Sequence, residues 1–125
     1  MMRRAWVLLS IVLMAALAIA AVSSSRWQQV PAKEHERVNP LGSKPEAVEA
    51  GARVYRDRCE QCHRADAMGD GHKRPALRSD RLRGASEGDI EWFLRQGDLG
   101  HGMPSWSSLP EAQRWQVVAY LKSIQ

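Results

Sequence analysis

Apolar side chains recur with the spacing of an α-helix in three segments of the chain, 43–57, 86–97 and 108–125. Residues three or four positions apart lie on the same face of a helix, so each segment predicts an amphipathic helix with one buried side. No segment alternates apolar and polar residues as a half-buried strand does. The pattern therefore predicts an all-α domain built on three main helices.

The ends of these helices carry local signals. Ser43 stands three residues before Glu46, which is the spacing of a capping box, so the first helix would begin near Ser43 with Pro45 in its first turn. Ser86 would begin the second helix with Asp89 at its third helical position, and Gly97 is a residue that can end it.

Long loops separate the three helices. The residues between Cys62 and Ser86, and between Gly97 and Ser108, are rich in Gly, Pro, Asp and Arg, with one short helical turn expected near 80–83. Loops of this length are uncommon in so small a domain unless they have something to pack against.

The N-terminal segment differs sharply from the rest. Residues 5–22 follow a basic start and contain Ser10 as their single polar residue. A membrane-spanning helix needs about 17–25 apolar residues and a signal peptide about 7–15, so the length favours an uncleaved anchor over residues 1–25. The small residues of Ala18-Ile19-Ala20 suit signal cleavage, which is the alternative. Either way the rest of the chain would lie outside the cytoplasm, on the periplasmic side, because basic ends stay inside.

Residues 26–42 are polar, contain Pro31 and Pro40, and show no helical or strand period. We expect a flexible tether there. The predicted order is thus an anchor or signal segment at 1–25, a tether at 26–42 and a folded domain at 43–125.

The charge of the chain narrows the possible partners. Its 18 Lys and Arg against 14 Asp and Glu give a net charge of +4, with no compact basic run, and this argues against nucleic-acid binding. Within residues 53–83, nine basic and five acidic side chains surround a pair of cysteines. This surplus is either an ordinary solvated surface or a means of steering an acidic partner.

The two cysteines and the histidine after them indicate a cofactor-binding site. Cys59-Glu60-Gln61-Cys62-His63 has the spacing of a c-type haem attachment site, in which both thiols bond to the porphyrin and the histidine binds its iron. A structural zinc site needs four ligands, and no second C-x-x-C or paired histidine supplies them. A thioredoxin-like pair needs a βαβ context, while a disulfide stays chemically possible outside the cytoplasm. We therefore predict one covalent haem c.

An iron bound by His63 has a second axial position to fill. Met68 and His72 follow His63 too closely for the chain to reach the opposite side of the ring. His101 and Met103 come a whole helix later, in a Gly-rich loop. We assign Met103 as the second ligand, with His101 as the next candidate.

In their order along the chain, these features resemble a short bacterial class I cytochrome c domain with one haem. The resemblance covers residues 45–125 and rests on Gly51-x-x-x-Tyr55, the Cys59–His63 run, Gly69-Asp70-Gly71, Pro75-x-Leu77, Gly102-Met103-Pro104-x-Trp106 and Val117–Leu121. It implies the cytochrome c fold, in which three main helices and long loops wrap round one haem. Two features depart from the family pattern, namely Lys73-Arg74 before Pro75 and His101 beside Met103.

The resemblance also implies contacts. Gly51 and Tyr55 would cross the last helix at Val117 and Tyr120.

Around the haem, the carbonyl of Pro75 would accept a hydrogen bond from His63 and so fix the imidazole ring. Leu77 would pack on the haem, and Trp106 would lie near its propionates.

These expectations describe an electron carrier and not an enzyme, since an iron with both axial positions filled has no room for a substrate. Its partners would be redox proteins that dock transiently at a haem edge near Cys59 and Cys62, such as a dehydrogenase or quinol-oxidising complex and a terminal oxidase. Residues 5–22 would hold it at the membrane, and no small-molecule substrate is expected. The alternatives are a haem subunit of a larger membrane-associated oxidoreductase complex, or a haem sensor or peroxidase-like enzyme, against which Met103 argues.

Overall fold

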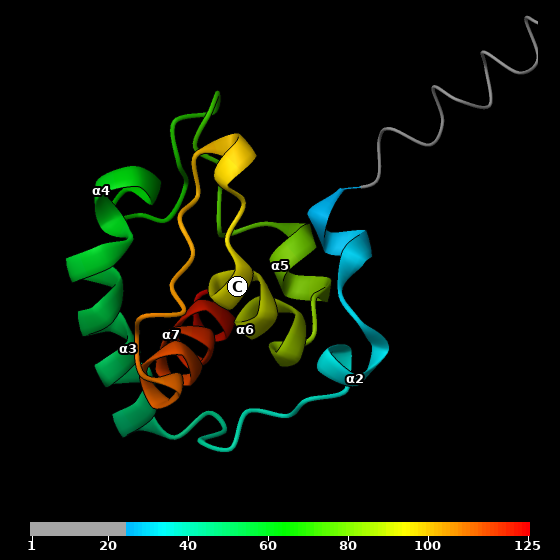
Figure 1. Cartoon of the computed structure of the whole chain (residues 1–125). Helices are drawn as coiled ribbons and strands as arrows, with labels where there is room; N and C mark the ends of the chain where they lie inside the picture. Colours follow the sequence, from blue (N-terminus) through cyan, green and yellow to red (C-terminus); the bar gives the residue numbers. More distant parts are fainter. Residues whose placement is uncertain (1–24) are drawn as a thin grey trace, which may run out of the picture.

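The computed structural model describes residues 25–125, whose course is shown in Figure 1. These residues form helices and loops without a strand, apart from an isolated bridge between Asp98 and Met103, so the all-α prediction is confirmed for them. The elements are η1 (Arg26–Gln29), α2 (Ala32–His35), α3 (Pro45–Arg58), α4 (Glu60–His63), α5 (Asp80–Gly84), α6 (Glu87–Gln96), η2 (Leu99–His101) and α7 (Glu111–Ser123), where η marks a 3-10 helix.

The membrane anchor predicted within residues 5–22 lies outside the described residues. Among residues 25–125, no helix is both long enough and apolar enough to cross a membrane.

The start of α6 agrees with the sequence, and the start of α3 does not. At α6, the Ser86 hydroxyl accepts from the Asp89 N–H at 3.0 Å and the Asp89 carboxylate accepts from the Ser86 N–H at 2.9 Å. The capping box predicted from Ser43 is wrong, because α3 begins at Pro45 and its N-cap is Lys44. Proline suits the first helical position since it has no N–H to leave unpaired, and this shifts the start past the reach of Ser43.

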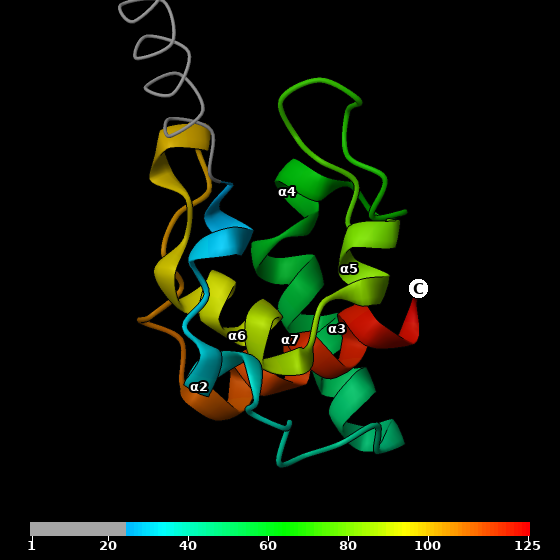
Figure 2. The same cartoon turned by 90° about the vertical axis from the view of Figure 1, so that its right-hand side faces the viewer.

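Helices α3 and α7 cross at very close range, and both views place them side by side (Figures 1 and 2). A Cβ atom added to Gly51 would lie 2.5 Å from the carbonyl carbon of Gln116, closer still to its oxygen, and 2.9 Å from Cβ of Tyr120. One turn on, the rings of Tyr55 and Tyr120 lie 5.1 Å apart. The predicted crossing is confirmed, with Gln116 rather than Val117 opposite Gly51.

The core lies between α3, α5, α6 and α7. Its buried residues come from all four helices and from the segment 59–67, which places the predicted site against the main core. They are Tyr55, Cys59, Ala67, Leu82, Ile90, Leu94, Trp115, Val117, Val118 and Leu121.

Residues 26–42 have more structure than the sequence predicted. They contain η1 and α2, and residues 26–39, which we call the N-terminal strap, lie along α6 (Figure 2). Trp27 stacks on Phe93 with ring centroids 4.5 Å apart, and the side-chain amide of Asn39 donates to the carbonyl of Trp115 at 2.9 Å. The expectation of a segment without regular structure is therefore wrong for these residues, because its contacts are to residues distant in the sequence. The division of the chain into domains stays a prediction.

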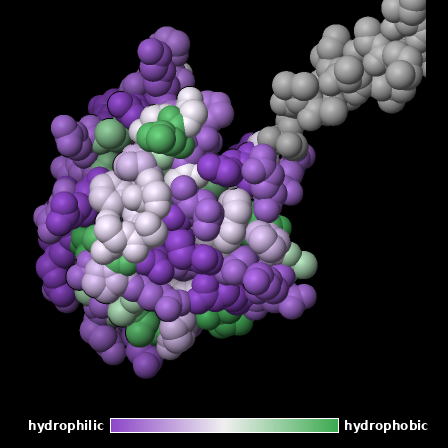
Figure 3. All heavy atoms as spheres, in the orientation of Figure 1, coloured by the Kyte–Doolittle hydropathy of each residue, from purple (hydrophilic) through white to green (hydrophobic). Residues whose placement is uncertain are grey.

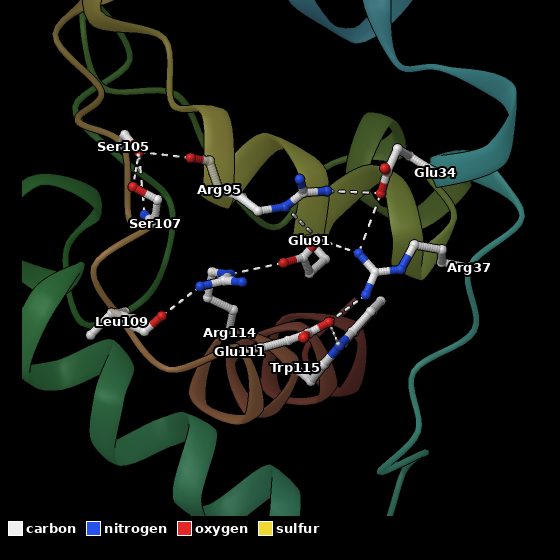
Figure 4. A network of polar contacts seen from close by, with 10 residues as sticks. All are labelled: Glu34, Arg37, Glu91, Arg95, Ser105, Ser107, Leu109, Glu111, Arg114 and Trp115. Atoms are coloured by element: carbon white, nitrogen blue, oxygen red, sulfur yellow. Dashed lines mark hydrogen bonds and ion pairs between the residues drawn. The ribbon is translucent and has the colours of Figure 1, made fainter.

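A network of ion pairs joins the strap to α6 and α7 (Figure 4). At its centre the Glu91 side chain is 0% exposed. One of its oxygens accepts from Arg114 at 2.8 Å, and the other lies 3.0 Å from Arg37 and 3.3 Å from Arg95. Glu34 of the strap also pairs with Arg95, at 2.8 Å. A buried carboxylate is tolerated when it is paired and hydrogen-bonded in this way.

Candidate haem-binding site

The cysteine motif sits where α3 breaks and α4 begins. Cys59 is the C-cap of α3 and its N–H still donates to the Tyr55 carbonyl, while its own carbonyl accepts from the N–H groups of Cys62 and His63. This helical turn places the two cysteines on one side, three residues apart. Cys59 is buried and Cys62 half-buried, both are free, and burial raises the pKa of the Cys59 thiol to about 11.

His63, in α4, is 6% exposed and its ring is fixed by one hydrogen bond. Nδ1 lies 3.0 Å from the carbonyl oxygen of Pro75. A carbonyl only accepts, so Nδ1 carries the hydrogen and Nε2 keeps its lone pair. Burial lowers the pKa of His63 and the nearby Arg74 charge lowers it further, against the opposing effect of the Pro75 bond. Burial and the Arg74 charge therefore favour the neutral ring, which is the form that binds a metal ion.

Pro75 is brought back to His63 by a tight loop. The Asp70 carboxylate accepts from the N–H groups of His72 and Arg74, both at 2.8 Å, and these bonds lower the pKa of Asp70. Gly69 has a φ of +63°, and a Cβ there would lie 2.8 Å from Pro75. From the sequence, Gly69-Asp70-Gly71 was used only as part of the family resemblance, and the role of Asp70 as the centre of the loop was missed.

Leu77, Met103 and Trp106 are half-buried and pack against the core cluster that includes Cys59. The Leu77 N–H donates to the Ala67 carbonyl at 2.8 Å, and the Trp106 N–H donates to the Leu94 carbonyl at 2.9 Å. The structure therefore directs all three predicted side chains toward the same core.

The remaining ligand candidates are exposed. His101 has 85% of its side chain exposed and pairs with Asp98 at 2.9 Å. Met68 is 49% exposed, and His72 lies on the surface. Met103 is the candidate of its loop that packs against the core cluster, and its backbone pairs with that of Asp98 by bonds of 2.8 and 3.0 Å.

The loops that carry Pro75 and Met103 meet at one point. A Cβ added to Gly102 would lie 3.5 Å from a guanidinium nitrogen of Arg74. Figure 1 shows both loops at the same end of the molecule, beyond α4. Arg74, one of the residues that depart from the family pattern, thus spans the two sides of the site.

The residues fit a covalently bound haem. Two free thiols lie one helical turn apart, and the next residue in the chain is His63, whose ring is fixed at Nδ1 by the Pro75 carbonyl. The indole N–H of Trp106 is buried and has no hydrogen-bond partner among the described residues. A buried donor without an acceptor is costly and rare in proteins, and a propionate oxygen is an acceptor of the required kind. The described residues contain no cluster of three or more His, Cys, Asp or Glu that would favour a bare metal ion instead.

An all-α fold with a C-x-x-C-H turn, a carbonyl-fixed histidine and an inward-facing methionine defines a c-type cytochrome domain. The comparison with protein families agrees. The family described as cytochrome C oxidase, cbb3-type, subunit III matches residues 46–121, and the chain belongs to this family. Its c-type cytochrome domain implies covalently bound haem c and haem-based electron transfer. No curated protein and no solved structure gives a significant match.

Proposed function

We propose that this protein is a mono-haem electron carrier in which Cys59 and Cys62 hold the haem, His63 and Met103 are the axial ligands, and Trp106 binds a propionate. The observation that carries the proposal is the buried His63, whose Nδ1 is 3.0 Å from the Pro75 carbonyl next to two free cysteines. When bound, the haem supplies an iron that takes up and releases one electron.

The chain's own residues set the conditions for that exchange. Pro75 holds the imidazole in one tautomer and one orientation, and the hydrogen bond makes His63 a stronger donor. The thioether of Met103 is a soft, weak donor that favours the reduced state and raises the potential. With both positions filled by protein, neither ligand has to leave when the oxidation state changes. That suits a carrier better than a sensor or a peroxidase-like enzyme.

We further propose that residues 5–22 anchor the domain at the membrane, with the haem domain on the periplasmic side. Transient redox partners would dock near the cysteines. The face in Figure 3 is mostly hydrophilic with small, separate apolar patches, and this supports transient rather than permanent contacts on that face.

The second candidate is a haem subunit of a larger membrane-associated oxidoreductase, and the family description favours it directly, since it names an oxidase subunit. Membranes solubilised in a mild detergent separate the two candidates by size. A carrier migrates as the single chain, whereas a subunit co-migrates with the other chains of its complex.

The haem site is tested on the full chain, produced with the c-type maturation machinery. Haem should stay on the chain in a denaturing gel and be lost in a Cys59→Ser/Cys62→Ser variant. The ferric protein should be low-spin with a weak sulfur-to-iron band at the red end of its spectrum. Met103→Leu should abolish that band while His101→Leu, its matched neighbour, retains it. A high-spin ferric spectrum of the unmodified protein, or tight carbon monoxide binding at neutral pH, would refute the carrier.

Membrane attachment has its own test. Membranes washed with high salt should retain the haem protein. A periplasmic form whose N-terminus is Ala21 or later would instead mean that the segment is a cleaved signal.

A further inference from the structure

The Met103 loop is closed by hydrogen bonds among its own residues and is tied to the end of α6, where the Trp106 N–H donates to the Leu94 carbonyl at 2.9 Å and the Ser105 hydroxyl to the Arg95 carbonyl at 2.7 Å. Its two sides are joined by the backbone pair of Asp98 and Met103, and Leu99 at its tip is 80% exposed. Its base is at the end of α6, where Gly97 has a φ of +67° and a Cβ would lie 2.6 Å from Pro104. The direction in which Met103 points thus depends on how firmly the end of α6 is held.

The first residues of the N-terminal strap contact that base. The guanidinium of Arg26 donates to the Gly97 carbonyl at 3.2 Å, and Trp27 stacks on Phe93, whose own carbonyl accepts from the Gly97 N–H at 2.7 Å. The last carbonyls of a helix carry partial negative charge, so a cation there is favourably placed. These contacts hold the residue from which the loop departs.

The strap is fixed along the rest of α6 as well. At the far end, Nδ1 of His35 lies 2.8 Å from the Asp89 carboxylate, and the Ser86 hydroxyl donates to the His35 carbonyl at 2.7 Å. Between the two ends, Arg37 and Glu34 join the ion-pair network of Glu91 (Figure 4). The strap therefore runs antiparallel to α6, from the base of the ligand loop to the helix N-terminus.

We propose that Arg26 and Trp27 are positioning residues for the Met103 ligand. They brace the end of α6 through Gly97 and Phe93, and so they limit the rate at which Met103 leaves the iron. The inference rests on the proposed ligation by Met103. Because the strap lies outside the segment matched by the family, residues 46–121, this brace is a feature of this chain's own N-terminal residues.

The test uses the full haem-loaded chain in detergent and imidazole as a probe that replaces Met103 on ferric iron. The rate is followed by loss of the sulfur-to-iron band, at a temperature where every variant is folded. Trp27→Ala should raise the rate roughly three- to tenfold, the factor expected for loss of one aromatic pair, and Arg26→Ala should raise it in the same direction. Trp27→Phe, which keeps the stack, should restore the original rate.

His35→Ala is the matched control, because it weakens the same strap at the end remote from the loop. It should leave the imidazole rate unchanged even where it lowers thermal stability. Equal acceleration by His35→Ala and Trp27→Ala would overturn the proposal, since it would indicate general loosening. An unchanged rate in both Arg26→Ala and Trp27→Ala would overturn it too. An unmodified protein without the sulfur-to-iron band would refute ligation by Met103, and the positioning role with it.

Discussion

Replacing Gly51 with alanine tests the close crossing of α3 and α7. The new Cβ would lie 2.5 Å from the Gln116 carbonyl carbon and 2.9 Å from Cβ of Tyr120, well inside normal contact distance. The backbone of Gln116 cannot rotate away as a side chain can, so α3 and α7 must separate. The rings of Tyr55 and Tyr120, which pack together one turn away, would then move apart as well.

The expected size follows from two opposing effects. Overpacking a core costs about 1–3 kcal/mol, and the upper end applies here because the obstructing atoms include backbone. Alanine recovers about 1 kcal/mol because it is the better helix former. The net loss of about 2 kcal/mol corresponds to a fall in Tm of roughly 8–16 °C for a domain of this size.

The measurement is thermal unfolding of the haem-loaded protein, followed by far-UV circular dichroism. Gly84→Ala is the matched control, since it makes the same chemical change in a helix where a Cβ would meet nothing within 4 Å. Its free energy of unfolding should stay the same or rise by up to about 1 kcal/mol, because alanine is the better helix former and meets no obstruction there. Equal Tm values for the two variants would refute the close crossing of α3 and α7.

Three further changes probe the polar contacts. Glu91→Gln should lower the free energy of unfolding by about 3 kcal/mol in urea titrations, because it removes the buried charge that Arg114 faces, whereas Glu49→Gln in an exposed pair should cost less than about 0.5 kcal/mol. Lys122→Met removes the ammonium that donates to three carbonyls at the end of α5, at 2.9 to 3.2 Å, and should cost about 1–2 kcal/mol by the same titration. The hydrogen bond from Arg37 lowers the pKa of Glu111 in the folded state, so its stabilisation is present above the ordinary pKa of 4.5 and is lost as the pH falls through the folded value. Glu111→Gln should therefore lower the urea midpoint at neutral pH, and the difference from the unmodified protein should shrink in acid; a difference that does not depend on pH would contradict this.

Much of the helical framework could be predicted because its signals are local. The Ser86–Asp89 capping box and the end at Gly97 are encoded within a few residues, and both are present in α6. The start of α3 was expected near Ser43 and lies at Pro45, with Lys44 as its N-cap, so the capping box expected from Ser43 is absent. The Cys59–His63 motif is also local, whereas the bond between His63 and Pro75 was expected only through the family resemblance.

The strap could not be predicted, and the reason is physical. Its contacts join residues more than 50 positions apart, such as Trp27 with Phe93 and Arg37 with Glu91, and no periodicity within the strap indicates them. The burial of Glu91 in α6 could not be predicted for the same reason. No role was assigned to this glutamate from the sequence, and the structure buries it because the strap covers a second face of α6.

The two halves of the site are held by different contacts, one by contacts between neighbouring residues and the other by contacts between distant segments of the chain. On the histidine side, the fold is built by short-range contacts, since Asp70 closes the loop on its own neighbours and Pro75 follows at once. On the methionine side, the loop leaves α6 at Gly97, and the strap contacts its base from a distant part of the chain. A contact between distant segments is lost when either segment moves, whereas a short loop keeps its bonds as a unit. Substitutions of Arg26 and Trp27 at the start of the strap should therefore weaken the methionine side of the site before the histidine side.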